Sequence, residues 1–320
     1  RGRYFVRRNS PIAITTVAAT IIGGLILDHF KLIGKESVGY SFIIGIGCIF
    51  ALISTLMLIK LPEAGKESTK IPHKFADIIA PLKDQRFRYL LKIFFVWNMA
   101  VGISAIFFAA HMLTNLKMSF LLISIYTASV ALSGIFMNRF WGMVIDKVGS
   151  RTVLAFCAFG ISFIPLVWLF PRAGLIWILG IESIYTGALW SGFNLAAFNV
   201  PIANSPQSQR TAYLAMFSVV TGLGFFISSL LGGLLAETFS SFSLTIGDYA
   251  FGNYHILFLI SALLRILTSF FIMKFHEPGE KSVPVMIQFM GYAALKQISV
   301  GRQLFPHRVT KKQTQNSGEI

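Results

Sequence analysis

The chain has 320 residues, and its composition excludes an ordinary soluble protein, because 55% of the residues are hydrophobic and only 13% are charged. Soluble domains carry about 25% charged residues, and a soluble core of this size has no room for so much apolar surface, so we expect lipid to be the solvent. The net charge of +15 does not indicate nucleic acid, because the basic residues lie between apolar runs and not on one soluble module.

Eight apolar runs are each long enough for a membrane-spanning helix, which needs about 20 mostly apolar residues. In chain order they lie near 10–28, 39–59, 89–112, 119–140, 152–170, 174–198, 211–237 and 254–275. Backbone polar groups find no water in lipid, so we expect helices and not open strands. The predicted fold class is therefore an all-α polytopic membrane protein.

Lysine and arginine residues are distributed unequally between the two sides of this arrangement. The side with both termini and the 60–92 junction receives 23 of the 28 basic residues, the other side receives four, and Arg265 lies inside a span. The positive-inside rule then predicts that both termini and the 60–92 junction are cytoplasmic. We expect an integral, multi-pass protein of the plasma (inner) membrane.

Two polar segments separate or follow the spans. Residues 60–88 are basic and contain three prolines, and their length favours a linker between two bundles over an ordinary surface loop. The tail 276–320 is also basic, and its stretch "VPVMIQFMGYAALKQI" predicts either a short interfacial helix or disorder.

Two distant stretches of the chain resemble each other without gaps, residues 1–30 and residues 210–239. In this alignment Gly23 and Gly24 meet Gly232 and Gly233, and Asp28 meets Glu237. Small residues at such positions allow close helix contact. Because the copies are the first and seventh spans, the repeat has a period of six helices with both copies in the same direction.

The junction "GMVIDKVGSR" resembles the cytoplasmic signature G-x-x-x-D-[RK]-x-G-[RK] of the major facilitator superfamily. The matching positions are Gly142, Asp146, Lys147, Gly149 and Arg151. A six-helix period in parallel orientation is also the arrangement of the two halves of such transporters. The resemblance makes the visible spans helices 5–12 of the major facilitator fold. It implies an N-terminally truncated chain, a fragment that is not expected to transport by itself.

The same resemblance predicts four parts of the chain. Residues 1–60 are a remnant of the N-terminal six-helix bundle, 61–88 the cytoplasmic central loop, 89–275 the C-terminal six-helix bundle and 276–320 the cytoplasmic basic tail. It implies a secondary active transporter or facilitator that moves a small solute by alternating access, and a non-transporting receptor or scaffold of the same fold is the alternative. We expect no enzyme, because the six histidines are scattered without an i,i+4 pair, and no cofactor or metal.

The signature junction has two readings. Gly142 lets a neighbouring helix approach, Asp146 sits near the start of the next helix, where an anion is favoured, and Lys147 and Arg151 pair with it or with lipid headgroups. The resemblance implies that this junction latches the two bundles together. The alternative is a tight basic turn that only fixes topology.

Charged and polar residues inside the spans are the candidate site. A charge at a helix centre costs about 2.5–3.5 kcal/mol on insertion scales, so Glu182 and Arg265 are expected either to bind substrate or a coupling ion, or to form a buried structural ion pair. The other candidates are polar or aromatic residues of spans 174–198 and 89–112: Trp190, Asn194, Trp97 and Asn98. His111 lies near the outer end of its span, where a histidine can titrate, and the favoured reading is that it only meets interfacial water.

The expected partners follow from this site and from the medium. They are membrane lipid and a small-molecule substrate, with a proton or sodium as the coupling ion, and the chain is expected to be monomeric and to bind no nucleic acid. The family's drug antiporters carry G-x-x-x-G-P-x-x-G-G in helix 5, whereas this chain has "TTVAATIIGG". The missing Gly-Pro argues against proton–drug antiport and leaves symport and uniport open.

Overall fold

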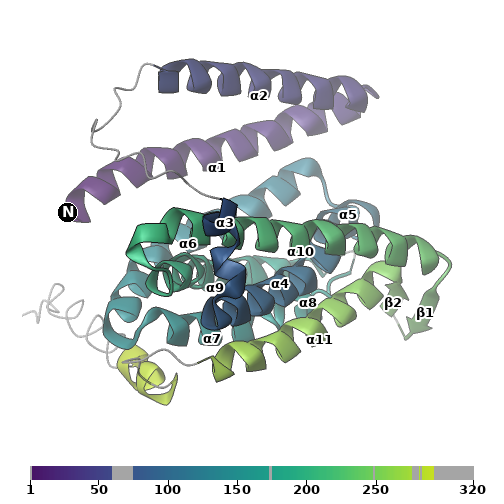
Figure 1. Cartoon of the computed structure of the whole chain (residues 1–320). Coiled ribbons are helices and arrows are strands. Elements are labelled where there is room, and N and C mark those ends of the chain that lie inside the picture. The colour runs from purple at the N-terminus through teal and green to yellow at the C-terminus, as the bar shows by residue number, and fades with distance from the viewer. Residues whose placement is uncertain are drawn as a thin grey trace, which may run out of the picture.

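Helices dominate the computed structural model, which describes residues 2–59, 75–172, 175–247, 249–275, 281 and 283–291 (Figure 1). In chain order the elements are α1 (Gly2–Leu32), α2 (Glu36–Ile59), α3 (Phe75–Lys83), α4 (Gln85–Ala105), α5 (Phe107–Thr114), α6 (Phe120–Val148), α7 (Ser150–Ile161), α8 (Ile164–Val167), α9 (Trp177–Ala203), the 3₁₀ turn η1 (Gln207–Gln209), α10 (Arg210–Thr238), β1 (Ser243–Ile246), β2 (Tyr249–Gly252) and α11 (Asn253–Lys274).

The predicted spans are helical, and the all-α membrane fold is confirmed. Within the described residues, seven helical stretches are long and apolar enough to cross a membrane. The eighth predicted span is α9, a helix of 27 residues whose glutamate, asparagines and hydroxyl side chains lower its hydropathy. The number of spans is therefore seven by composition, and α9 is the long helix that composition alone leaves out.

Several helix ends differ from the prediction for identifiable reasons. The span 89–112 is divided at Ile106 into α4 and α5. The span 152–170 is divided into α7 and α8, where Pro165 lies in the first turn of α8, a position that suits a residue without a backbone N–H. Helix α6 continues to Val148 instead of ending at 140, and Gly149 ends it with φ +99°, a conformation that favours glycine.

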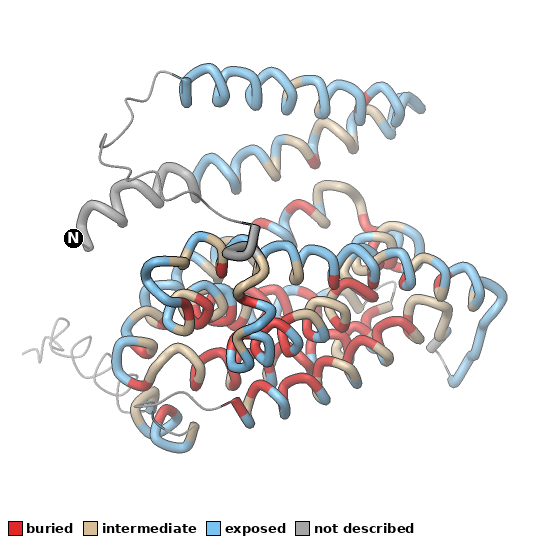
Figure 2. The backbone as a smooth tube through the Cα atoms, viewed as in Figure 1, coloured by how far each residue is buried: buried red, intermediate tan, exposed pale blue. Residues whose placement is uncertain are grey.

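The long helices from α4 to α11 form one compact bundle, and α1 and α2 lie along one side of it (Figure 1). Burial follows the same division, since buried residues concentrate inside the bundle and α2 is exposed over most of its length (Figure 2). The core contains large side chains that are at most 2% exposed, among them Trp97, Trp141, Trp168 and Phe258. Helix α1 packs against α6, and α2 packs against α1.

A β-hairpin that the sequence did not predict joins α10 to α11. Strands β1 and β2 are antiparallel, with Ser243 opposite Gly252 and Ile246 opposite Tyr249. The Gly252 N–H donates to Nδ1 of His255 at 3.0 Å, and the Asn253 side chain donates to the Ala236 carbonyl at 2.9 Å. These bonds fix the hairpin to the end of the bundle where α6 begins, which we call the hairpin end.

Part of the basic tail is packed on the opposite, junction end of the bundle. Residues 283–291 are helical, and Met286 is fully buried. The Lys281 N–H donates to the Val148 carbonyl at 3.1 Å, and the Thr152 hydroxyl donates to the Lys281 carbonyl at 2.6 Å. Most of the 60–88 segment and of the tail lies outside the described residues, and the end of that segment forms α3 and the start of α4.

Candidate functional site

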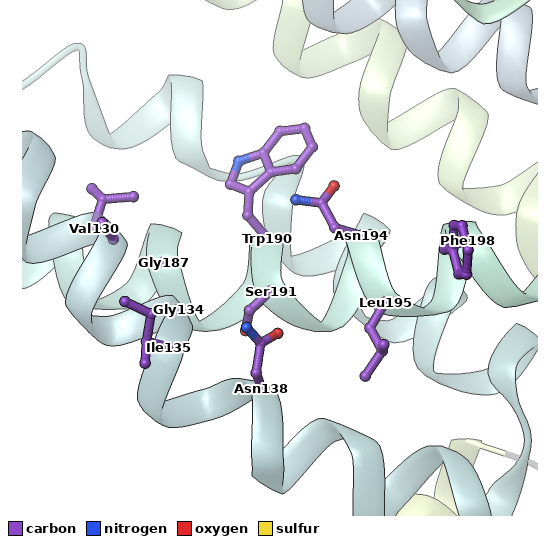
Figure 3. Close-up of a pocket in the computed structure, with 11 residues that line it drawn as sticks. Val130, Gly134, Ile135, Asn138, Gly187, Trp190, Ser191, Asn194, Leu195 and Phe198 are labelled. Carbon is purple, nitrogen blue, oxygen red and sulfur yellow. The ribbon is translucent and has the colours of Figure 1, made fainter. Parts of the chain in front are cut away.

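A groove of about 430 Å³ lies between α6 and α9. Its lining residues come from these two helices alone (Figure 3): Val130, Ala131, Gly134, Ile135 and Asn138 from α6, and Gly187, Trp190, Ser191, Asn194, Leu195 and Phe198 from α9. Two of the predicted candidates, Trp190 and Asn194, are therefore brought together here.

The two helices that form the groove touch each other through small residues. A Cβ atom added to Gly187 would lie 2.1 Å from the Val130 carbonyl oxygen and 2.8 Å from Cβ of Ser133. The Ser133 hydroxyl donates to the Ile184 carbonyl at 2.7 Å across the same contact. Such close backbone approach is the usual role of small residues in membrane helices.

The groove offers hydrogen-bonding groups without charge. Asn138 and Asn194 are exposed, and neither carboxamide has a hydrogen-bond partner among the described residues. Trp190 is half-buried, and its ring meets Phe193 edge-on with centroids 5.4 Å apart. A carboxamide both donates and accepts hydrogen bonds and an indole donates one, so these groups can bind a polar, uncharged solute.

Glu182 lies in α9 but does not line the groove. It is 3% exposed, and its carboxylate accepts a hydrogen bond from the Tyr126 hydroxyl at 2.7 Å and another from the Thr186 hydroxyl. Neutral donors from α6 and α9 thus satisfy this acid inside the bundle.

Arg265 is buried in a different part of the bundle, between α11 and α4. It is 2% exposed, and its Nη2 donates to the Ser104 hydroxyl at 3.1 Å, which in turn donates to Ser261 at 2.9 Å. Its Nε has no partner among the described residues. Within the described part of the chain no ion pair joins Arg265 to Glu182, so the structural ion pair that was one of the two expectations is not formed.

Trp97 and Asn98 lie outside the groove. Trp97 is 1% exposed and stacks on Phe193 with centroids 4.8 Å apart. Phe193 is also the ring that Trp190 contacts. The Asn98 side chain donates to the Phe94 carbonyl of its own helix at 2.8 Å and packs beside Gly224 of α10. Both residues support packing of α4 in this structure.

The structure corrects two expectations about the signature junction. Asp146 and Lys147 lie in the last turn of α6 and are exposed, so Asp146 is not at the start of the next helix. A Cβ atom on Gly142 would meet no atom within 4 Å, so no neighbouring helix approaches there in the described structure. Gly149 supplies the turn, and Arg151 donates to the Met273 carbonyl of α11.

His111 is also not where the sequence placed it. The side chain is 1% exposed, and neither ring nitrogen has a hydrogen-bond partner among the described residues. Its ring meets the His255 ring at right angles with centroids 4.9 Å apart. The expectation of interfacial water at His111 is wrong, because Trp168, which directly follows α8, and Phe258 of α11 cover this end of α5.

Sequence reasoning missed Asn138, Ser191 and Tyr126 as neighbours of the candidates. Asn138 was visible as a polar residue near the end of an apolar run, and Ser191 lies beside Trp190 in the sequence. Tyr126 gave no signal of its own, because only the packing of α6 against α9 shows that it reaches Glu182.

Comparisons with known proteins agree with this architecture. A family model described as Major Facilitator Superfamily matches residues 1–205 and, in a second match, residues 94–305. Human (Homo sapiens) monocarboxylate transporter 6 is 32% identical over 111 residues, which are 35% of this chain and 21% of that protein. The crystal structure of the nucleoside transporter NupG superimposes with a TM-score of 0.58 at 16% identity, covering 83% of this chain and 66% of NupG. At that identity the likeness shows the fold alone.

Proposed function

The chain belongs to the major facilitator superfamily, and from this premise we propose that it takes part in moving a small solute across a membrane by alternating access. The solute site is the groove between α6 and α9, with Trp190 as the flat apolar contact and Asn138 and Asn194 as the hydrogen-bonding groups. The observation that carries the proposal is the pair of exposed carboxamides on walls that carry no charged side chain. Polar groups at membrane depth usually face a water-filled cavity or a partner.

The proposed solute is uncharged and polar. The two transporters that the chain resembles are named for different solutes, monocarboxylates and nucleosides. None of the residues that line the groove carries a charge, and a carboxylate bound there would gain no ion pair from this wall. A nucleoside presents both a flat face for Trp190 and donor and acceptor groups for the asparagines.

Counterflow in proteoliposomes that hold this chain joined to a complete N-terminal six-helix bundle tests this proposal. We expect labelled uridine to exchange faster than labelled lactate, and we expect Asn138→Ala and Asn194→Ala each to slow uridine exchange about tenfold, as for loss of a substrate hydrogen bond of about 1.4 kcal/mol. Asn98→Ala is the matched control, because its side chain is already bonded to its own helix. The groove is not the solute site if lactate exchanges faster than uridine. The same conclusion follows if Asn98→Ala slows uridine exchange as much as Asn138→Ala and Asn194→Ala do.

Glu182 is the proposed coupling residue. Its carboxylate is buried beside the hydroxyls of Tyr126 and Thr186, and no ion pair holds it among the residues that the structure describes, so it can exchange a proton without breaking one there. Glu182→Gln keeps the shape and removes the proton exchange. We expect exchange that no longer responds to a pH gradient, and a gradient response equal to that of the unchanged protein rules out this role.

The proposal also includes the division of the chain into four parts. The first part, 1–60, is a remnant of the N-terminal bundle, and 61–88 is the cytoplasmic central loop. The C-terminal bundle is 89–275, and the cytoplasmic tail is 276–320. Both basic ends face the cytoplasm of the plasma membrane, and the chain acts as a monomer. Cysteine labelling from each side of a sealed membrane at Asp146 and at Leu244, both exposed, tests the orientation, since the proposal requires the two sites to react from opposite sides.

A further inference from the structure

The first turn of α11 is closed by a histidine. His255 is the third residue of this helix, and its Nδ1 accepts the backbone N–H of Gly252, the N-cap residue, at 3.0 Å. The side chain that reaches back to the N-cap in this way is ordinarily that of Glu or Gln. Because Gly252 is also the last residue of β2, this bond joins the β1–β2 hairpin to the bundle (Figure 1).

A second histidine lies against the first. The ring of His111 in α5 meets the His255 ring at right angles with centroids 4.9 Å apart, and the two side chains are 1% and 5% exposed. The rings of Trp168, Tyr254 and Phe258 also cover His111, with centroids 5.6–6.3 Å away. Like charges disfavour each other at such separations, so this contact is stable only while at most one of the two histidines is protonated.

The neutral form of His255 fits this place and the protonated form does not. A neutral imidazole that accepts at Nδ1 carries its proton on Nε2, whereas both nitrogens of a protonated ring are donors. After protonation, an Nδ1–H group would therefore point at the Gly252 N–H, donor against donor. The positive ring would also lie in the first turn of α11, where the helix dipole disfavours a cation. A metal ion fits poorly as well, because Nε2 of the neutral ring is occupied by its proton and the described residues contain no group of three ligating side chains.

Among the described residues, no carboxylate is bonded to His255 to favour its charged form. Glu237 of α10 and Lys117, which follows α5, are both exposed, and Glu182 accepts hydrogen bonds from hydroxyls. Helices α4 and α7 carry their charged residues near the junction end. The groups around the histidine pair that can titrate or carry a charge are thus Tyr254 of α11, Glu237 of α10, Lys117 and, beyond the Trp168 ring, Tyr126 of α6 and Glu182 of α9.

We propose that His255 makes the β1–β2 hairpin a proton-sensitive cover of the hairpin end. While the ring is neutral, its bond to Gly252 holds the hairpin on the bundle. When water at the hairpin end delivers a proton to Nδ1, the ring leaves the first turn of α11, the bond to Gly252 is lost and the hairpin moves away, which removes one of the rings that cover His111. Histidine ordinarily changes its charge between pH 5 and 8, so this anchor responds to acid where Gln would not. The device depends neither on the identity of the solute nor on Glu182.

A spin label on the hairpin tests this proposal in the full chain in nanodiscs. With Cys48→Ser as background, Thr245→Cys places the label at an exposed position of β1, and Cys157 is fully buried and stays unlabelled. We expect the mobile fraction of the label to rise at least threefold when the pH falls from 7.5 to 5.0, and to return when the pH is restored. In the protein without the label, Cys157 should stay unreactive to a thiol dye at both pH values, because the bundle itself remains folded.

Three variants separate protonation of His255 from other effects of acid. His255→Gln keeps an acceptor for Gly252 and cannot titrate, so the label should stay immobile at both pH values. His255→Ala removes the acceptor, so the label should be mobile at both. His29→Gln is the matched control at an exposed histidine of α1 and should leave the response unchanged. Equal mobility at both pH values in the protein with His255, the same rise in His255→Gln, or a rise that occurs only together with reaction of Cys157 would each overturn the proposal.

Discussion

The contact of α9 with α6 at Gly187 gives the sharpest stability prediction. Gly187→Ala adds a methyl group 2.1 Å from the Val130 carbonyl oxygen, which is more than 1 Å inside normal contact, so the helices must separate. Overpacking of this kind costs about 1–3 kcal/mol, and the bond from Ser133 to Ile184, which separation would break, adds about 1 kcal/mol. Alanine regains about 1 kcal/mol in helix propensity, so we expect a net loss of about 1–3 kcal/mol.

The matched control is Gly180→Ala in the same helix. Gly180 is exposed, and an added Cβ atom meets nothing within 4 Å, so this variant should be neutral or slightly stabilised. The chain also supplies its own reporter, because Cys157 is fully buried and Cys48 is exposed. With Cys48→Ser as background, a thiol-reactive dye reports unfolding through Cys157 alone.

The expected result is a thermal midpoint several degrees lower for Gly187→Ala than for Gly180→Ala. Equal midpoints would show that the two helices separate without cost, and the close α6–α9 contact would then not stabilise the bundle. A midpoint lowered equally in both variants would mean that the effect comes from glycine removal in α9 and not from the contact.

Three further predictions follow from individual contacts. Asp28→Asn should lower the free energy of unfolding by about 1–2 kcal/mol and speed amide hydrogen exchange at the start of α6, because the Asp28 carboxylate accepts the first two backbone N–H groups of that helix; unchanged exchange there would contradict the capping role. Arg265→Met should cost less than about 1 kcal/mol or stabilise the protein, because it removes a buried charge whose partner among the described residues is the Ser104 hydroxyl. A loss of 3 kcal/mol or more in denaturant titration would show a stronger partner. Met286→Glu should release residues 283–291 from the bundle and make them cleavable by protease, and full resistance to cleavage would contradict their docking.

The membrane fold was predictable because it depends on averages over long stretches. Twenty apolar residues leave few alternatives to a spanning helix. The length of α9 also indicates a membrane span, although its polar residues lower its hydropathy. The extension of α6 was also readable in hindsight, since Trp141, Val144 and Val148 are buried at helical spacing. Asp146 was expected at the start of the next helix because the predicted span ended at residue 140, whereas α6 continues to Val148.

The candidate site was predictable only in part, because the sequence gives depth along a helix but not the neighbour that a side chain meets. Trp190 and Asn194 line one groove, which their spacing along the helix allowed without requiring it, while Glu182 and Arg265 face different helices. The glycine pairs illustrate the same limit. Close contact was expected at both, and the structure shows it for Gly24 and Gly232. An added Cβ atom at Gly23 would lie 4.0 Å from Cδ1 of Ile43, which is an ordinary contact, and one at Gly233 would meet nothing within 4 Å. Which member of a pair packs depends on helix rotation.

The hairpin of β1 and β2 has a practical consequence for work on this protein. It extends beyond the ends of α10 and α11 (Figure 1), and Leu244 and Ile246 on it are 47% and 60% exposed. Because backbone and side-chain bonds at Gly252 and Asn253 tie it to the helices, an antibody fragment raised against this loop would be held rigidly. Such a complex would add a recognisable mass outside the detergent micelle and so provide the alignment marker that electron cryo-microscopy of a small membrane protein needs.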